Sequence, residues 1–289
     1  MANSDDTIPR IITRPLPNAV TYDLSSPDRV TITLPPSSTW SSGLHWHESH
    51  TEYLQVLRGS IKVRLGDREQ IVSASPGNQP EITVPRYAWH ESHTEYLQVL
   101  RGSIKVRLGD REQIVSASPG NQPEITVPRY AWHEWRRADP HGGEDVVVSE
   151  RTEPADGEKA LFFWNLNGVI LDAPRMLDDG KSFISRCPAG ARGPLLDLWI
   201  TLNLFVIFYH LDNVPVFVDF PDLVRGRKES AFIPRRVLVL GDWVVSHVVL
   251  FVASWVGWLL NARPLRLKYT PAREYAAWME KKHRHTKDA

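Results

Sequence analysis

The chain has 289 residues, with 34 basic and 34 acidic side chains, 42% hydrophobic residues and one cysteine, Cys187. This length is enough for one or two domains with a proper core. The zero net charge argues against a nucleic-acid-binding protein, and a single cysteine excludes a disulfide scaffold and a multi-cysteine zinc module. The polar N-terminus shows no signal peptide, so we expect a protein that is not secreted.

The chain contains an internal tandem repeat. Residues 46–88 recur without one change at 89–131, and the triplet Trp-His-Glu returns at 132–134. Propellers and solenoids need several copies, because each unit buries its apolar face on its neighbours. Two identical copies indicate instead a duplication or a gene-model error, and we interpret the protein as a one-copy design that carries an extra copy.

Short alternating segments dominate the first half of the chain. Arg29–Leu34 is β-branched and alternating, and Ile61, Val63 and Leu65 alternate with two basic residues. Further short strands are expected at 71–73, 82–84, 145–149 and 160–164. With Gly and Pro turns between them, these segments predict an all-β sandwich or small barrel over residues 25–166, after an N-terminal extension of residues 1–24.

The second half is apolar and helical in character. A linker with a short helix is expected at 167–193, followed by an apolar helical region at 194–262 and a basic helical tail at 263–289. Within the apolar region, residues 237–260 are long enough to cross a hydrocarbon core of roughly 30 Å at about 1.5 Å per residue. Residues 195–218 form a second, weaker candidate segment.

Basic residues flank the stronger apolar segment, and Trp243 and Trp258 lie near its ends, where interfacial tryptophans belong. The tail after Leu260 has more Lys and Arg than the connector before the segment, which favours a cytoplasmic tail and a membrane-associated, cytoplasmic-facing barrel. The alternative is a buried core helix of a soluble domain.

Candidate metal ligands lie within and around the repeat. His45 and His47 are at positions i and i+2 of a strand, so both imidazoles share one face. Glu52 follows on an apolar face, where a carboxylate is costly unless it is paired or binds a metal. His90, or its counterpart His133, supplies a third imidazole. Such a set suits one divalent ion of Fe, Mn, Zn, Ni or Cu, without choosing among them.

These residues resemble the two motifs of the cupin superfamily. His45, His47, Glu52 and Gly59 match its first motif, and the pairs Pro85–His90 and Pro128–His133 match its second. The chain departs at turn positions: the expected glycines are Thr39 and Tyr87 or Tyr130, and the expected asparagine is Thr94 or Arg137. The resemblance implies a jelly-roll barrel with one mononuclear metal centre and, as in relatives, a homodimer.

The duplication leaves the last ligand open. In the second copy, Ala88 stands in the place of His45, so we expect one competent site rather than two. It would be built from His45, His47 and Glu52 with either His90 or His133, but not both. The spacing of the family's motifs favours His90, whereas the position of the strands that close the barrel favours His133.

The chain also resembles fungal cupins with apolar C-terminal segments that are encoded near polyketide synthase genes. This implies an accessory enzyme of oxygenase, isomerase or decarboxylase type, acting on a small aromatic or polyketide-derived molecule. No separate catalytic residue can be named. The alternatives are a non-catalytic, membrane-anchored binding or scaffold protein, and an inactive product of the duplication.

Overall fold

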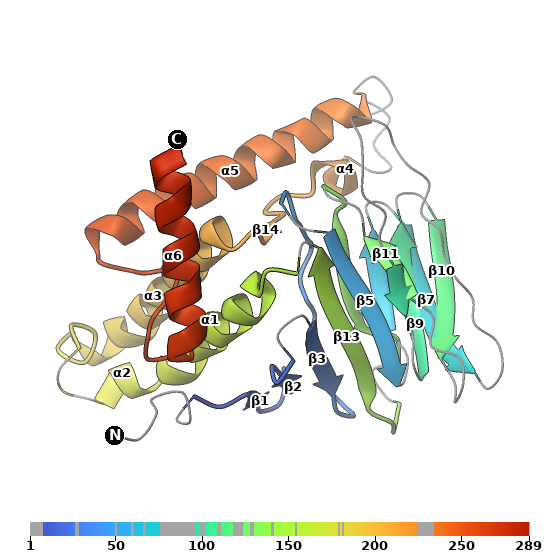
Figure 1. Ribbon diagram of the computed structural model, residues 1–289, viewed down its shortest axis with the longest axis horizontal. Coiled ribbons are helices and arrows are strands. Elements are labelled where there is room, and N and C mark those ends of the chain that lie inside the picture. The colour runs from blue at the N-terminus through green and yellow to red at the C-terminus, as the bar shows by residue number, and fades with distance from the viewer. Residues whose placement is uncertain are drawn as a thin grey trace.

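The computed structural model describes residues 8–288, except 27–28, 50, 59–60, 66–67, 76–95, 99–101, 109–110, 118–123, 128–129, 140–141, 154, 179, 181 and 225–233. Figure 1 shows the strands gathered on one side of the molecule and the helices on the other.

The described strands form two seven-stranded sheets. The first has the order β1 (Ile11–Arg14), β2 (Val20–Asp23), β3 (Arg29–Leu34), β13 (Val146–Glu153), β5 (Thr51–Arg58), β11 (Glu124–Val127), β8 (Tyr96–Gln98). The second has the order β10 (Arg111–Ala117), β7 (Arg68–Ser75), β9 (Gly102–Leu108), β6 (Ile61–Leu65), β12 (His133–Arg137), β4 (His45–Trp46), β14 (Val214–Pro215). Most neighbouring strands are antiparallel, and helices follow in the chain, which fits the predicted cupin-type barrel with a helical C-terminal region.

The two copies of the repeat form the same hairpin. In the first copy Leu65 pairs with Arg68, and in the second Leu108 pairs with Arg111 at the equivalent positions. The end of the second copy closes against the start of the first, because β11 pairs with β5 and the following strand β12 pairs with β6. Strands of both copies therefore contribute to the sheets that carry the histidines.

Two expectations about element boundaries need correction. The N-terminal extension contains β1 and β2, which pair in sequence onto β3 and so belong to the first sheet. The strand expected at 160–164 is wrong, since these residues begin helix α1 (Glu158–Asp172). Its apolar residues are consecutive rather than alternating because several sides of the helix are buried, with Phe162, Phe163 and Trp164 all in the core.

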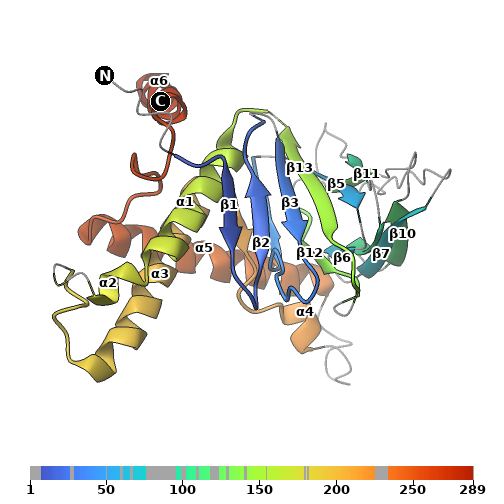
Figure 2. The same cartoon turned by 90° about the horizontal axis from the view of Figure 1, so that it is seen from below.

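The remaining helices are α2 (Arg175–Asp178), α3 (Ala189–His210), α4 (Phe220–Leu223), α5 (Arg235–Leu259) and α6 (Ala272–Asp288). The linker expected at 167–193 is thus largely helical. One buried cluster joins Tyr22 and Ile32 of the first sheet to Phe163 of α1, Ile207 of α3 and Leu265 before α6. Figure 2 shows α1 beside β1 and β2, and α3 beyond it.

Helices α3 and α5 are long and apolar enough to cross a membrane, with mean hydropathies of 1.4 and 2.0 over their most apolar windows and 22% of each window buried. These properties concern length and composition alone, so the predicted membrane association stays a prediction. Most of the predicted basic helical tail forms α6, which starts directly after Pro271.

Candidate metal centre

Three buried histidines meet at the junction of β4 and β12. His45 pairs in register with His133, and His47 follows β4 on the same side as His45. One ring nitrogen of each lies within 4.8 Å of the others. The ring centroid of His45 is 4.0 Å from that of His133 and 5.1 Å from that of His47. The exposed fractions are 6% for His45 and His47 and 0% for His133.

Each imidazole is held by a different backbone carbonyl. The Nδ1 atoms of His45 and His133 lie 2.9 Å from the Gly43 oxygen and 3.0 Å from the Ala131 oxygen. The Nδ1 of His47 contacts the Asp212 carbonyl oxygen. Because a carbonyl can only accept, Nδ1–H is the donor in each ring and the lone pair is on Nε2. Carbonyl-held Nδ1–H groups are the usual way in which proteins orient metal-ligating histidines.

Burial also keeps these rings neutral. It lowers the pKa of His133 to about 4 and those of His45 and His47 well below their usual value, and the neighbouring imidazoles lower the pKa of His45 further. A histidine must be neutral to bind a metal. The tautomers, the neutrality and the convergence of the three rings therefore fit a divalent metal ion.

The other two predicted ligands are less fully placed. Glu52 lies on β5, in register with Thr152 of β13 and Val127 of β11, and nothing further is described of it. His90 lies outside the described residues. Of the two alternatives for the last histidine, His133 is the one that the structure places beside His45 and His47.

Tyr130 occupies the place of the second motif's glycine and still makes the turn. It adopts φ 61°, a left-handed conformation that favours glycine and costs a tyrosine on the order of 1 kcal/mol. Its N–H donates to the carbonyl oxygen of His47 at 2.8 Å. This hydrogen bond ties the segment before His133 to the segment that carries His47.

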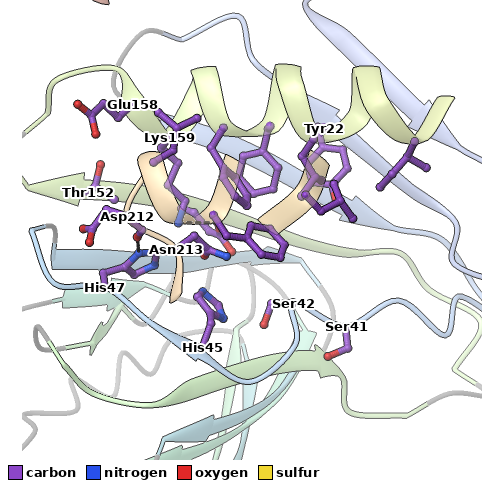
Figure 3. A pocket seen from close by; sticks show the side chains of 18 of the residues that line it. Tyr22, Ser41, Ser42, His45, His47, Thr152, Glu158, Lys159, Asp212 and Asn213 are labelled. Carbon is purple, nitrogen blue, oxygen red and sulfur yellow. Dashed lines mark hydrogen bonds and ion pairs between the residues drawn. The ribbon is translucent and has the colours of Figure 1, made fainter. Parts of the chain in front are cut away.

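A cavity of about 230 Å³ is lined in part by His45 and His47 (Figure 3). Figure 3 shows Lys159 descending from α1 toward Asp212, above His45 and His47. The Lys159 Nζ lies 3.0 Å from the Glu150 Oε2, and Trp135 Nε1–H donates to Glu150 Oε1 at 2.6 Å. Burial raises the pKa of Glu150 to about 8 and lowers that of Lys159 well below its usual value. This buried pair holds a proton beside the cavity.

The helical region supports the site through Asp212. The residue follows α3 in a left-handed conformation, φ 47°, and its carboxylate accepts from the backbone N–H groups of Glu48 at 2.7 Å and Ser49 at 2.8 Å. Next to it, β14 pairs with β4, placing Pro215 opposite His45. The segment 212–215, between α3 and α4, therefore braces β4 and the loop after His47.

Sequence reasoning did not identify the charged residues that line the cavity, among them Arg14, Glu150, Lys159 and Asp212. Two of them carry a signal in the alternation of their strands. Glu150 continues the inward positions of Val146 and Val148, and Arg14 shares a strand face with Ile12. Lys159 and Asp212 lie at a helix start and in a loop, where no periodicity identifies them.

No protein-family model matches the chain, and no curated protein does. Solved structures match part of it: the capsular polysaccharide assembling protein CapF from Staphylococcus aureus (14% identity, TM-score 0.27, 52% of this chain and 30% of CapF), KdgF from Halomonas sp. (12%, 0.26, 49% and 84%), and a cupin 2 domain-containing protein from Halorhodospira halophila (14%, 0.23, 43% and 50%). The last of these is named as a cupin 2 domain-containing protein. With TM-scores this low, the case for a cupin-type centre rests on this chain's own strands and histidines.

Proposed function

We propose that the chain is a metal-binding cupin that holds one divalent ion through the Nε2 atoms of His45, His47 and His133. The observation that carries this proposal is the set of three buried, neutral imidazoles on neighbouring strands, each oriented by its own backbone carbonyl. Leaving three buried imidazoles close together has no packing advantage, whereas a metal ion makes the arrangement favourable.

Glu52 is the proposed fourth ligand. Its partner in the strand register, Thr152, lines the same cavity as His45 and His47. A three-histidine, one-carboxylate set accepts Fe, Mn, Zn, Ni or Cu and leaves positions for water or substrate.

We further propose an accessory enzyme of oxygenase, isomerase or decarboxylase type, acting on a small aromatic or polyketide-derived molecule. A bound ion would polarise a substrate oxygen. The chain's own residues would do the rest. Tyr22, Phe163 and Phe208 form an apolar wall that can hold an unsaturated ring and exclude water, and the Glu150–Lys159 pair can give or take a proton at the cavity surface.

The test uses the purified full chain, incubated with each candidate metal and desalted before elemental analysis. We expect close to one ion per chain for the preferred metal, and loss of that ion in His45→Ala. His283→Ala is the matched control, because this histidine is exposed on α6. Sub-stoichiometric metal under every loading condition would contradict the proposal and favour a non-catalytic scaffold. Oxygen uptake and product analysis with phenolic and aldehyde substrates then test for catalysis.

A further inference from the structure

Five charged residues line the cavity, and they differ in their partners: Arg14, Glu150, Glu158, Lys159 and Asp212. The three carboxylates are all engaged. Glu150 pairs with Lys159, Glu158 accepts from Lys281 at 2.9 Å, and Asp212 accepts two backbone N–H groups. No carboxylate of the cavity has a recorded bond to Arg14.

Arg14 is fixed in place but not satisfied. Its Nε–H donates to the Asn167 Oδ1 at 2.6 Å, and the Asn167 amide donates in turn to the Phe163 carbonyl at 2.8 Å. The guanidinium carbon lies 5.5 Å from the centre of the Tyr22 ring. Its Nη2 atom is buried and has no hydrogen-bond partner, and it is the one such side-chain atom among the described residues that are not exposed.

A buried, unpaired donor on a charged group costs on the order of 1–3 kcal/mol, so its persistence needs a reason. Part of the cavity wall is apolar, since the side chains of Tyr22, Phe162, Phe163, Leu166 and Phe208 line the cavity. The volume of about 230 Å³ lies below the range of roughly 300–1,000 Å³ typical of ligand pockets, which indicates a small ligand.

We infer that Arg14 binds the carboxylate of a small hydrophobic acid whose apolar body fills the cavity. The inference deepens the proposed function, since it names the substrate class for the cavity beside the histidines. Asn167 and Tyr22 orient the guanidinium, Arg14 lines the cavity, and a carboxylate bound there supplies the guanidinium with a charged acceptor.

The test is calorimetric titration of the full chain with benzoate and with benzamide, which has a similar shape but no charge. We expect wild type to bind benzoate at least about tenfold more tightly than benzamide, because only benzoate brings a charged acceptor to the buried donor. Arg14→Gln should abolish that preference, and Arg14→Lys should retain part of it. Arg10→Gln, at an exposed arginine near the same strand, should leave it unchanged.

Each titration is run with metal-loaded and with metal-free protein, so that failure of the metal centre and failure of this inference are distinguishable. A preference for benzoate that depends on Arg14 in both states supports it. Equal affinity for the two probes, no saturable benzoate binding to wild type, or a preference that survives in Arg14→Gln would overturn it. Near-ultraviolet circular dichroism shows that each variant is folded.

Helix α5 reverses the usual amphipathic pattern, because polar residues lie on its buried face and apolar residues on its exposed face. Its buried positions are Asp242, Ser246, Leu250, Ala253 and Gly257, which form one stripe along the helix. The Asp242 carboxylate accepts from the Phe220 N–H at 3.0 Å, and Ser246 Oγ–H donates to the Pro215 carbonyl at 2.7 Å. At Gly257, an added Cβ would lie 2.4 Å from a methyl of Val206. The stripe therefore packs on the protein from end to end.

The opposite face of α5 is apolar and exposed. From Trp243 to Leu260 every exposed residue is apolar, including Phe251, Trp255 and Trp258 at 52%, 57% and 64% exposure. Figure 1 shows α5 along the outer edge of the molecule, beyond α3, β14 and α4. Soluble monomers rarely expose a contiguous apolar surface of this extent. Exposed basic residues flank it, with Arg235 and Arg236 at one end and Arg263 at the other.

We infer that this face lies in a lipid surface, with α5 parallel to the membrane plane rather than crossing it. The buried stripe binds α5 to α4 and β14 as well as to α3. If α5 crossed the bilayer, the irregular segment that carries α4 and β14 would enter the hydrocarbon with it, where exposed backbone polar groups are costly. The apolar face would enter the acyl boundary, and the flanking arginines would meet anionic headgroups.

The test is flotation of the full chain with phosphatidylcholine vesicles, with and without phosphatidylserine. We expect flotation that increases with phosphatidylserine and is lost in Phe251→Glu/Trp255→Glu, while Ile11→Glu, at an exposed apolar residue of β1, has no effect. Quenching by lipids brominated at different depths should place all α5 tryptophans at one shallow depth. In a Phe251→Trp variant, quenching of the added indole at the bilayer centre would contradict the in-plane orientation. Failure of the wild type to float would overturn the lipid assignment. A dimer that forms without lipid and becomes monomeric in Phe251→Glu/Trp255→Glu would also overturn it.

Discussion

The β region, from β1 to β13, and the helical region, from α1 to α6, contribute differently to one site. The β region supplies all three imidazoles and two of the carbonyls that orient them. The helical region supplies the third carbonyl, at Asp212, and half of the Glu150–Lys159 pair. The helices therefore complete the candidate metal centre, in addition to any contact with a membrane.

The largest expected effect comes from removing residues 194–289, which contain most of α3 and all of α4, α5 and α6. A chain that ends at residue 193 lacks Ile207, Leu211 and Leu265, which share the buried cluster of Tyr22 and Phe163. We expect this fragment to lose cooperative unfolding, because the first sheet would expose its apolar face to water. Thermal unfolding followed by circular dichroism measures it, with a chain ending at His283 as the control. A folded, metal-binding fragment would show that the β region is independent.

Acid should destabilise the metal-free protein through the buried imidazole of His133. The unfolded chain binds a proton at His133 below pH 6.5, whereas the folded, metal-free chain does so only near pH 4. The contribution of His133 to stability is therefore complete above pH 6.5 and is lost as the pH decreases to 4, a change of about 3 kcal/mol. Urea unfolding of metal-free protein at several pH values measures this. His133→Gln should flatten the slope, and an unchanged slope would refute the assignment.

A smaller effect tests the packing within the helical region. An added Cβ at Gly168 of α1 would lie 2.3 Å from the Tyr269 ring, whereas nothing lies within 4 Å of the Cβ position at Gly190 of α3. We expect Gly168→Ala to cost about 1–3 kcal/mol through overpacking, and Gly190→Ala to cost nothing. Differential scanning calorimetry compares the two melting temperatures. Equal values would mean that α1 and the segment before α6 do not pack as described.

Local periodicity predicts part of this molecule. It identifies β3, the hairpin of the repeat and the two strand-borne histidines, because alternation and motif spacing are properties of adjacent residues. It fails at α1, where burial on several sides removes the helical period. It places Arg14 on the same strand face as Ile12 without showing its role, and it misses Asp212 altogether. A loop carbonyl or a part-buried guanidinium acquires its role only when residues more than a hundred positions apart come together.

The most direct test of the account is the metal content of His133→Ala and His90→Ala, each measured in the full chain by elemental analysis after loading. We expect His133→Ala to lose the ion and His90→Ala to retain close to the wild-type content, because His133 lies with His45 and His47. Equal loss in both variants, or loss in His90→Ala alone, would contradict a single centre built from His45, His47 and His133.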